Sequence, residues 1–431
     1  MKKNLLFILL LFLMFGLFAC GSNNDSLIDE VSGGRVYGDS DVYTGSESFG
    51  TVVPGGYGYS KAEAAVDGVY YEPAGSYTGE YADVAAGVDD PMEAVITEEP
   101  VLPTETPEPT EEPVFEAGQL TASAYFDNDY YSFWKELVST NQQGDGLFKV
   151  YKNKRDFNTE NRIKVTLENT PYATVTVDDF TGVTNSNGEV YLFPSVVKDS
   201  YTIEISIPTE GGVTKLTKTL SDGNELYLSS DDIGVLVSKS EVIQLMFVVD
   251  TTGSMGDEIS YLKSEIASVI DAVKEDNENV TIYLSLLFYR DKGDDYVTNF
   301  YDFSTDISLQ QARLSREYAS GGGDFPEAVA EALTVASEAQ WMTKATKILV
   351  HVADAPDHEA NYKAWHEVTL KLASLGVRVI TVASSGIDKE TEYFFRCEAL
   401  LTNGCYGYLT NDSGIGGFHI DATTAEKMPV E

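Results

Sequence analysis

Three oxygen-bearing side chains stand at alternate positions of one short segment: Asp250, Thr252 and Ser254. Because this segment directly follows an apolar run, its carboxylate and hydroxyl oxygens are able to turn towards one point. Oxygen ligands of low total charge suit a hard divalent cation such as Mg²⁺, with water filling the remaining octahedral positions. Mn²⁺ and Ca²⁺ take ligands of the same kind. The spacing therefore predicts a divalent-cation site at this segment.

Two more segments carry carboxylates that are candidates to complete this site. Asp354 directly follows a second apolar run, 347–353. Asp324 follows three consecutive glycines, whose lack of a side chain lets the backbone approach other groups closely. Asp324 together with Glu327 also fits a helix capping box ahead of Pro326. Metal contact and helix capping therefore both remain open for Asp324.

Alternating strands and helices are expected to hold these segments. The run 242–249 is apolar throughout, as in a strand buried on both faces, whereas 257–275 repeats its apolar residues with the period of a helix. Further strands are predicted at 280–288, 296–303, 347–353, 377–383 and 405–409, and further helices at 309–318, 326–339, 360–375 and 390–401. This alternation predicts an α/β fold with a doubly wound, mostly parallel sheet, which binds ligands beyond the carboxyl ends of its strands. The loops after Val249 and Ala353 are therefore expected to form the site.

Residues 240–420 resemble a von Willebrand factor type A domain, which has a Rossmann-like fold. The resemblance rests on Asp-x-Thr-x-Ser after an apolar strand, the Gly-Gly-Gly-Asp turn, and an Asp after a later strand. That family carries a metal-ion-dependent adhesion site, in which Asp-x-Ser-x-Ser, a threonine and an aspartate come from three loops. The resemblance implies that Asp250, Thr252 and Ser254 are the first-loop ligands and that Asp354 is the late aspartate.

Two departures from the family pattern affect the expected site. Thr252 stands where serine is usual, which keeps the hydroxyl. Asp324 stands in the place of the family's threonine, and a second direct carboxylate raises cation affinity but lowers the positive charge that the metal shows to a partner. The stretches 249–255, 288–291 and 323–327 look most like the bacterial and alpha-kinase-associated branch of the family. No kinase signature accompanies them, so no kinase activity is expected.

Three polar residues near the expected site are not expected to bind the metal or to take part in catalysis. Arg290 and Asp291 leave a buried strand, and we expect them to form a local ion pair or to support the ligands rather than to bind the metal. His358 is expected to be a polar surface residue rather than a catalytic one, because no activated nucleophile stands beside it.

The first 20 residues have the character of a targeting segment. Two lysines precede an apolar run, 5–18, that is too short to span a bilayer comfortably. The run ends in Ala19-Cys20, which resembles a bacterial lipobox. The resemblance implies a lipoprotein signal peptide over residues 1–19, diacylglycerol on the Cys20 thiol and an acylated amino terminus, for example with palmitate. The mature protein is then expected at the bacterial cell membrane, lipid-anchored and outside the cytoplasm.

Residues 20–118 are predicted to form a disordered acidic tether. From Gly21 to Gly118 there are 21 acidic and 2 basic residues, a net charge of 2 − 21 = −19 out of −40 for the whole chain. A segment of this charge, rich in Gly, Ser and Tyr and then in Pro, buries too little apolar surface to offset its chain entropy. The overall acidity argues against nucleic acid as a partner, since no phosphate-neutralising surface is expected, and against electrostatic binding to anionic lipids.

Two further pieces are expected between the tether and the α/β part. Residues 119–143 are expected to hold a short helix around 130–137. Residues 144–236 alternate apolar and polar residues with a period of two, which predicts about seven short strands in a small all-β sandwich. Within it, Asn187-Gly188 is a strong signal for a tight hairpin, and Gly211-Gly212 indicates another turn.

The chain has three cysteines. With Cys20 assigned to the lipid, Cys397 and Cys405 are the remaining pair. A location outside the cytoplasm permits a disulfide between them. Two buried thiols remain open as the alternative, because the sequence does not show the geometry.

The resemblance implies an adhesion module rather than an enzyme. Its ligands fill part of a Mg²⁺ shell, and a carboxylate from an extracytoplasmic protein or polymer completes it. The alternative is a structural subunit of an envelope complex, in which the metal only stabilises three loops. A Mg²⁺-dependent phosphotransferase is disfavoured because it needs a second acid where Thr252 stands. A serine hydrolase is disfavoured because Gly253-Ser254 lacks the nucleophile-elbow spacing.

Overall fold

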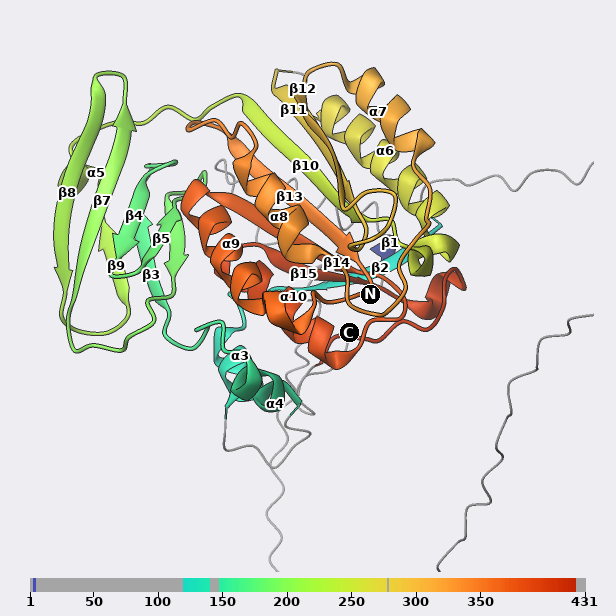
Figure 1. Ribbon diagram of the computed structural model, residues 1–431. Coiled ribbons are helices and arrows are strands. Elements are labelled where there is room, and N and C mark those ends of the chain that lie inside the picture. Colours follow the sequence, from blue (N-terminus) through green and yellow to red (C-terminus); the bar gives the residue numbers. More distant parts are fainter. Residues whose placement is uncertain (1–2, 5–118, 140–146, 277–278, 424–431) are drawn as a thin grey trace, which may run out of the picture. The chain divides into compact units, whose positions relative to one another are not determined.

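The computed structural model describes residues 3–4, 119–139, 147–276 and 279–423 (Figure 1). The predicted tether, Cys20, and the predicted signal peptide apart from Lys3–Asn4 lie outside these residues. Within the described ranges, no helix combines the length and the apolar character that crossing a membrane requires.

An eight-stranded sheet forms the centre of the C-terminal part, in the order β1-β2-β15-β14-β13-β10-β11-β12 (Figure 1). The strands are β1 (Lys3–Asn4), β2 (Thr121–Tyr125), β10 (Val242–Asp250), β11 (Thr281–Tyr289), β12 (Thr298–Ser304), β13 (Thr346–Ala353), β14 (Val377–Ala383) and β15 (Cys405–Leu409). Neighbours from β11 to β15 pair in parallel, whereas β12 pairs antiparallel with β11, and β2 pairs antiparallel with β15. The predicted α/β fold with a mostly parallel sheet is confirmed.

Helices cover both faces of this sheet (Figure 1). They are α6 (Ile259–Asp276), α7 (Ile307–Arg316), α8 (Val329–Glu338), α9 (Tyr362–Leu375) and α10 (Lys389–Leu401), with short 3₁₀ turns η1 (Gly253–Asp257), η2 (Glu359–Asn361) and η3 (Asn411–Ser413). Along β10, Leu245 and Phe247 join the core that contains α6 and α7, whereas Met246 and Val248 join the core that contains α8, α9 and α10. Successive side chains of a strand point to opposite faces, so a strand covered on both faces is apolar throughout.

Strand β2 was not predicted from the sequence. Residues 119–143 were expected to hold only a short helix, which is confirmed as α3 (Tyr131–Val138). The strand β2 precedes it and pairs with β15, which lies almost 300 residues later; Thr121 Oγ1 contacts Thr410 Oγ1 at 2.8 Å. Five residues with weak alternation carry little strand signal, and the pairing that stabilises them is set by tertiary structure.

A small β-sandwich lies between α3 and the large sheet in the sequence. Its strands are β3 (Ile163–Leu167), β4 (Thr174–Val177), β5 (Phe180–Val183), β6 (Glu189–Leu192), β7 (Tyr201–Thr209), β8 (Gly212–Leu220) and β9 (Glu225–Leu228), followed by a short helix, α5 (Ser230–Ile233). They form a three-stranded sheet, β6-β3-β9, and a four-stranded sheet, β5-β4-β7-β8. Alternate apolar residues of both sheets share one core, as the period of two predicts. The start of the segment differs from the prediction, because α4 (Leu147–Lys154) is a helix and contacts α3 and α10.

The predicted hairpin at Asn187-Gly188 is wrong. A tight turn is present, with Gly188 at φ +82° and its N–H donating to Asn185 O at 2.9 Å. The strands on either side, however, pair with different partners: β5 with β4 in one sheet and β6 with β3 in the other. A Cβ at Gly188 would lie 1.8 Å from Leu167 O, so this turn is a crossover between the sheets that is packed against β3.

The two C-terminal cysteines are buried free thiols. Cys397 lies in the core that contains α8, α9 and α10, whereas Cys405 lies in the core that contains α6 and α7. They therefore belong to cores on opposite faces of the sheet, and the disulfide considered from the sequence is not formed.

A buried ion cluster fastens the segment before α3 to α10. The Arg396 guanidinium donates to the Asp127 carboxylate at 2.9 Å and to Glu392 Oε1 at 3.2 Å. It also lies over the rings of Tyr125 and Trp134, 4.7 and 5.5 Å from their centroids. Removing one partner of a buried charge cluster is costly because the other charge stays buried without compensation.

We predict that Asp127→Ala lowers the free energy of unfolding of the full chain by about 3–5 kcal/mol, since Arg396 then keeps only Glu392 as a carboxylate partner. Glu367→Ala is the control, because Glu367 belongs to an exposed pair with Lys363, and it should cost less than about 0.5 kcal/mol. Urea denaturation followed by circular dichroism measures both. Equal losses for the two variants would contradict a stabilising role of the cluster.

Candidate functional site

The ends of two neighbouring strands bring Asp250 and Asp354 together. Asp250 is the last residue of β10, and Asp354 directly follows β13. These strands pair in parallel, with Val249 opposite Val352, so both carboxylates lie at the carboxyl edge of the sheet. This is the edge at which ligands bind in open α/β sheets.

Polar contacts connect four of the residues predicted as ligands. Asp250 Oδ1 accepts from the Thr252 N–H at 2.8 Å and from Thr252 Oγ1 at 2.7 Å. Thr252 Oγ1 contacts Ser254 Oγ at 3.1 Å, and the Ser254 hydroxyl lies beside the Asp354 carboxyl group, where it opposes the rise of that group's pKa. Asp250 and Thr252 are fully buried, whereas Ser254 is exposed. The chain of oxygens from Asp250 to Asp354 is therefore open to solvent at Ser254.

The glycine turn is hydrogen-bonded to the first loop. Gly253 N–H donates to Gly321 O at 3.1 Å, and the Gly322 N–H donates to Asp294 Oδ2 at 2.8 Å. Gly321 has φ +80°, and a Cβ there would lie 2.4 Å from the Asp294 carboxylate. A side chain at this position would be strained and would collide. The expectation that the glycines allow close backbone approach is confirmed.

Glu327, which the sequence offered only as a capping residue, lies at the site. It is buried, and its N–H donates to Pro356 O at 2.9 Å in the loop that follows Asp354. A Cβ at Gly322 would lie 3.0 Å from Glu327 Oε1 and 3.3 Å from Thr252 Cβ, so the Glu327 carboxyl group and the first loop both lie beside Gly322. Asp324 is exposed and, within the described part of the chain, makes no hydrogen bond or ion pair. Its role as a ligand stays a prediction.

The predicted capping box of Asp324 and Glu327 is wrong. Helix α8 begins at Val329 rather than at Pro326, and its N-cap residue makes no side-chain cap. The backbone at Glu327 is extended instead, in a parallel bridge with Asp357, which delays the helix. Asp357 then caps the helix from another loop by accepting from the Ala330 N–H. No local sequence signal reveals a cap that comes from 27 residues away.

Three carboxylate oxygens at the site are buried without a hydrogen-bond partner among the described residues: Asp250 Oδ2, Asp354 Oδ1 and Glu327 Oε2. Burial, and then the charge of Asp354, raises the pKa of Asp250 to about 8. Burial, and then the charge of Asp250, raises the pKa of Glu327 to about 9. Burial also raises the pKa of Asp354 to about 6. Buried anionic oxygens without partners are costly, and a bound cation would offset that cost.

The chemistry of this donor set fits a hard divalent cation. The free oxygens of Asp250 and Asp354 stand beside the Thr252 and Ser254 hydroxyls, and Ser254 is open to water. In the described ranges, no three or more His, Cys, Asp and Glu side chains form a group that holds a metal ion. The donors are thus few carboxylates together with hydroxyls and water, a combination that suits Mg²⁺.

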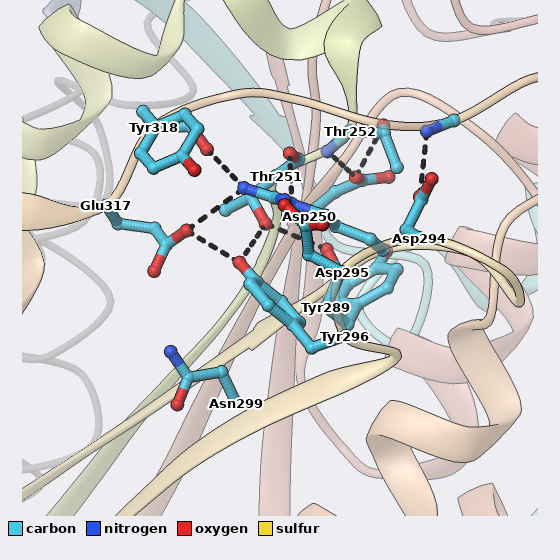
Figure 2. A network of polar contacts seen from close by, with 12 residues as sticks. Asp250, Thr251, Thr252, Tyr289, Asp294, Asp295, Tyr296, Asn299, Glu317 and Tyr318 are labelled. Carbon is cyan, nitrogen blue, oxygen red and sulfur yellow. Dashed lines mark hydrogen bonds and ion pairs between the residues drawn. The ribbon is translucent and has the colours of Figure 1, made fainter.

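Arg290 supports the backbone of the first loop. Its guanidinium donates to the carbonyls of Thr251 at 3.2 Å and Tyr318 at 2.9 Å, and lies 3.5 Å from Glu317 Oε1. Figure 2 shows Glu317 and Tyr296 beside Thr251; the Tyr296 hydroxyl is 2.6 Å from Glu317 Oε1 and 2.8 Å from Thr251 Oγ1. Arg290 therefore holds the loop backbone, as expected from the sequence, and does not neutralise Asp250.

Asp291 and His358 form a pair at the rim of the site. His358 Nε2 lies 2.7 Å from Asp291 Oδ1, and the His358 side chain is partly exposed. The expected local ion pair of Asp291 is thus made with His358 rather than with Arg290. Asp291 also receives support from Asp294, whose Oδ2 accepts from the Asp291 N–H at 3.2 Å.

Comparisons with known proteins agree with the fold. Residues 244–414 match the family model of the von Willebrand factor A domain. The chain is similar to the alpha-protein kinase vwkA of Dictyostelium discoideum, with 28% identity over 162 residues, which cover 37% of this chain and 26% of the relative. It is also similar to the "Putative ariadne-like RING finger protein R811" of Acanthamoeba polyphaga mimivirus, with 33% identity over 117 residues, which cover 27% of this chain and 11% of the relative.

The matched region spans only about a quarter of the first relative and about a tenth of the second. What is shared is therefore the domain and not the whole protein. A von Willebrand factor A domain is present at residues 244–414, inside the bounds predicted from the sequence. A domain of this family supports a role in protein interaction or metal-dependent adhesion in general.

We predict that the metal-free protein loses stability as pH rises from about 4 to about 9. The folded pKa values of Asp250, Asp354 and Glu327 lie above the ordinary values of unfolded carboxyls. The folded state therefore binds more protons in this window, and its advantage is lost as pH passes the folded pKa values. The midpoint of thermal unfolding in chelator should fall by on the order of 5 °C between pH 5 and pH 9.

Asp250→Asn is the matched control for this pH dependence, because it removes one of the shifted groups and keeps the shape of the side chain. Its pH profile should be flatter than that of the wild type. Superimposable profiles of the two proteins would show that the general acidity of the chain, and not the site, causes the loss.

Proposed function

We propose that this chain is a lipid-anchored, extracytoplasmic binding module whose von Willebrand factor A domain holds a divalent cation and binds a partner through it. One observation carries the proposal. The buried, unpartnered oxygens of Asp250 and Asp354 belong to a hydroxyl chain that reaches solvent at Ser254. Mg²⁺ is the first candidate cation, with Mn²⁺ and Ca²⁺ next, because the donors are oxygens throughout.

The roles of the chain's own residues follow from their contacts. Asp250 and Asp354 would supply the charged ligands, and Thr252 and Ser254 would supply neutral ones. Thr252 also fixes the orientation of Asp250, since its N–H and hydroxyl both donate to Asp250 Oδ1 and leave Oδ2 free. A bound divalent cation would present open coordination positions to an oxygen of the partner. For that group the family resemblance suggests a carboxylate of an extracytoplasmic protein or polymer.

The anchoring half of the proposal is supported by the sequence alone. Cys20 and the acidic segment 20–118 lie outside the described residues. A diacylglycerol on Cys20 with an acylated amino terminus would give stable membrane attachment. The net charge of −19 over 98 residues favours an extended spacer, which would hold the folded part away from the membrane.

A purely stabilising metal is the second candidate. The complete burial of Asp250 and Thr252 favours it, because a cation there would relieve buried charge even without a partner. The exposure of Ser254 favours partner binding instead. The phosphotransferase alternative is weaker, because the acid that it needs is replaced by Thr252, whose hydroxyl donates to Asp250.

We predict that the purified full chain takes up about one Mg²⁺ ion in calorimetry and releases at least about one proton per ion near pH 7, because Asp250 must lose its proton to bind metal. Titrations in buffers of different ionisation enthalpy count the protons. Asp250→Asn should weaken uptake at least about a hundredfold, whereas Asp222→Asn, at an exposed position of the β8–β9 turn, should leave it unchanged.

A second measurement distinguishes partner binding from simple stabilisation by the metal. The full chain is immobilised, and retention of components from an envelope extract is compared with and without chelator for the wild type and the two variants. Retention that chelator and Asp250→Asn both abolish, with no loss of thermal stability in the variant, supports the binding module. Unchanged retention with a large loss of stability supports the stabilising metal, and no Mg²⁺ uptake by the wild type rejects both.

A further inference from the structure

Glu327 is a buried carboxylate at the site that the Asp-x-Thr-x-Ser motif does not include. It is 2% exposed, and its Oε2 has no hydrogen-bond partner among the described residues. Its Oε1 lies against Gly322 on the side where Thr252 also packs, since a Cβ at Gly322 would lie 3.0 Å from this oxygen and 3.3 Å from Thr252 Cβ. The charged group that acts on it most strongly is Asp250.

The backbone fixes this carboxylate in place. The Glu327 N–H donates to Pro356 O at 2.9 Å, and Glu327 forms a parallel bridge with Asp357, in the loop that begins with Asp354. The backbone of Glu327 is thus held to the loop that contains Asp354, and its side chain lies near the loop that contains Asp250 and Thr252. Asp324, three residues earlier, is exposed and has no such attachment.

We propose that Glu327, rather than Asp324, is the third-loop carboxylate that faces the cation, and that its charge makes the loaded site favour a neutral oxygen of the partner over a carboxylate. This inference rests on the cation site of the proposed function, and it replaces the partner carboxylate that the family resemblance suggests with a neutral oxygen. On this proposal Glu327 acts from outside the directly bound ligands, as a carboxylate that orients them and adds negative charge.

The net charge of the loaded site determines which group of the partner it prefers. A divalent cation with ionised Asp250 and Asp354 carries no net charge, and an ionised Glu327 brings the sum to −1. The basic side chains around the rim do not restore the balance, because each already has an acidic partner: His358 is paired with Asp291, Lys292 with Glu331, and Arg290 with Glu317. A partner carboxylate would meet like charge, which opposes binding. A hydroxyl or amide oxygen would not.

Two measurements on the full chain test this inference, with Glu327→Gln as the variant and Asp324→Asn as the matched control. Calorimetry gives the Mg²⁺ affinity. With Mn²⁺ saturating the site, the proton relaxation rates of the methyl groups of acetate and acetamide report how closely each probe approaches the ion. Acetate and acetamide have nearly the same shape and differ in charge, so their ratio isolates the effect of charge.

The two readouts should change in opposite directions in Glu327→Gln. Mg²⁺ affinity should fall by about tenfold, because a carboxylate that orients the ligands is lost. Relaxation of acetate relative to acetamide should rise by at least about threefold, because the like charge is gone. Asp324→Asn should leave both values within about twofold. A merely structural role of Glu327 would lower the affinity without changing the acetate-to-acetamide ratio.

The inference is overturned if Glu327→Gln leaves both values unchanged, if the ratio falls, or if Asp324→Asn is the variant that shows the two changes. Glu327→Asp is a second variant, which keeps the test valid if Glu327→Gln does not fold. It keeps the charge but withdraws the carboxylate by one methylene, so Mg²⁺ affinity should fall while acetate stays disfavoured; a rise of the acetate ratio in this variant also overturns the inference. Absence of Mg²⁺ uptake by the wild type would instead reject the proposed function itself.

Discussion

Uncompensated negative charge at the carboxyl edge of the sheet is the constraint on which the site depends. Parallel pairing of β10 and β13 places Asp250 and Asp354 side by side, and each keeps a buried oxygen that no described group satisfies. Desolvation raises the pKa of both carboxyl groups, and the charge of Asp354 raises that of Asp250 further. A fold keeps such a cost when something bound there, such as a cation, removes it.

The surrounding contacts hold these oxygens close without neutralising them. Thr252 donates to one oxygen of Asp250 and leaves the other free. Arg290 is buried near the first loop, yet its guanidinium is engaged by the carbonyls of Thr251 and Tyr318 and by Glu317. The Arg290 guanidinium therefore positions the backbone of the loop. The buried carboxyl groups of Asp250 and Asp354 therefore gain no compensation from Arg290.

Much of this arrangement follows from local sequence. The apolar run 242–249 and the segment 347–353 are predicted as buried strands, and strand ends fix where Asp250 and Asp354 stand. The spacing of Thr252 and Ser254 then suffices to predict which hydroxyls join them. The three glycines also carry a readable signal, since positive φ at Gly321 excludes a side chain.

Other features depend on tertiary contacts that no local pattern carries. Glu327 looks like a capping residue because Pro326 precedes it, and only the bridge to Asp357 reveals an extended backbone there. Strand β2 forms because it pairs with β15 along the side of that strand that β14 leaves free. The turn at Gly188 has the sequence of a hairpin but connects two sheets, because packing against β3 decides the partners of its strands.

The most direct test of the central claim is a crystal structure of the full chain grown with Mn²⁺, with anomalous diffraction used to locate the ion. The account predicts one strong anomalous peak within about 2.0–2.3 Å of oxygens from Asp250 and Asp354 or their hydroxyl neighbours. A crystal that contains Mn²⁺ but shows no peak at the carboxyl ends of β10 and β13 would contradict it.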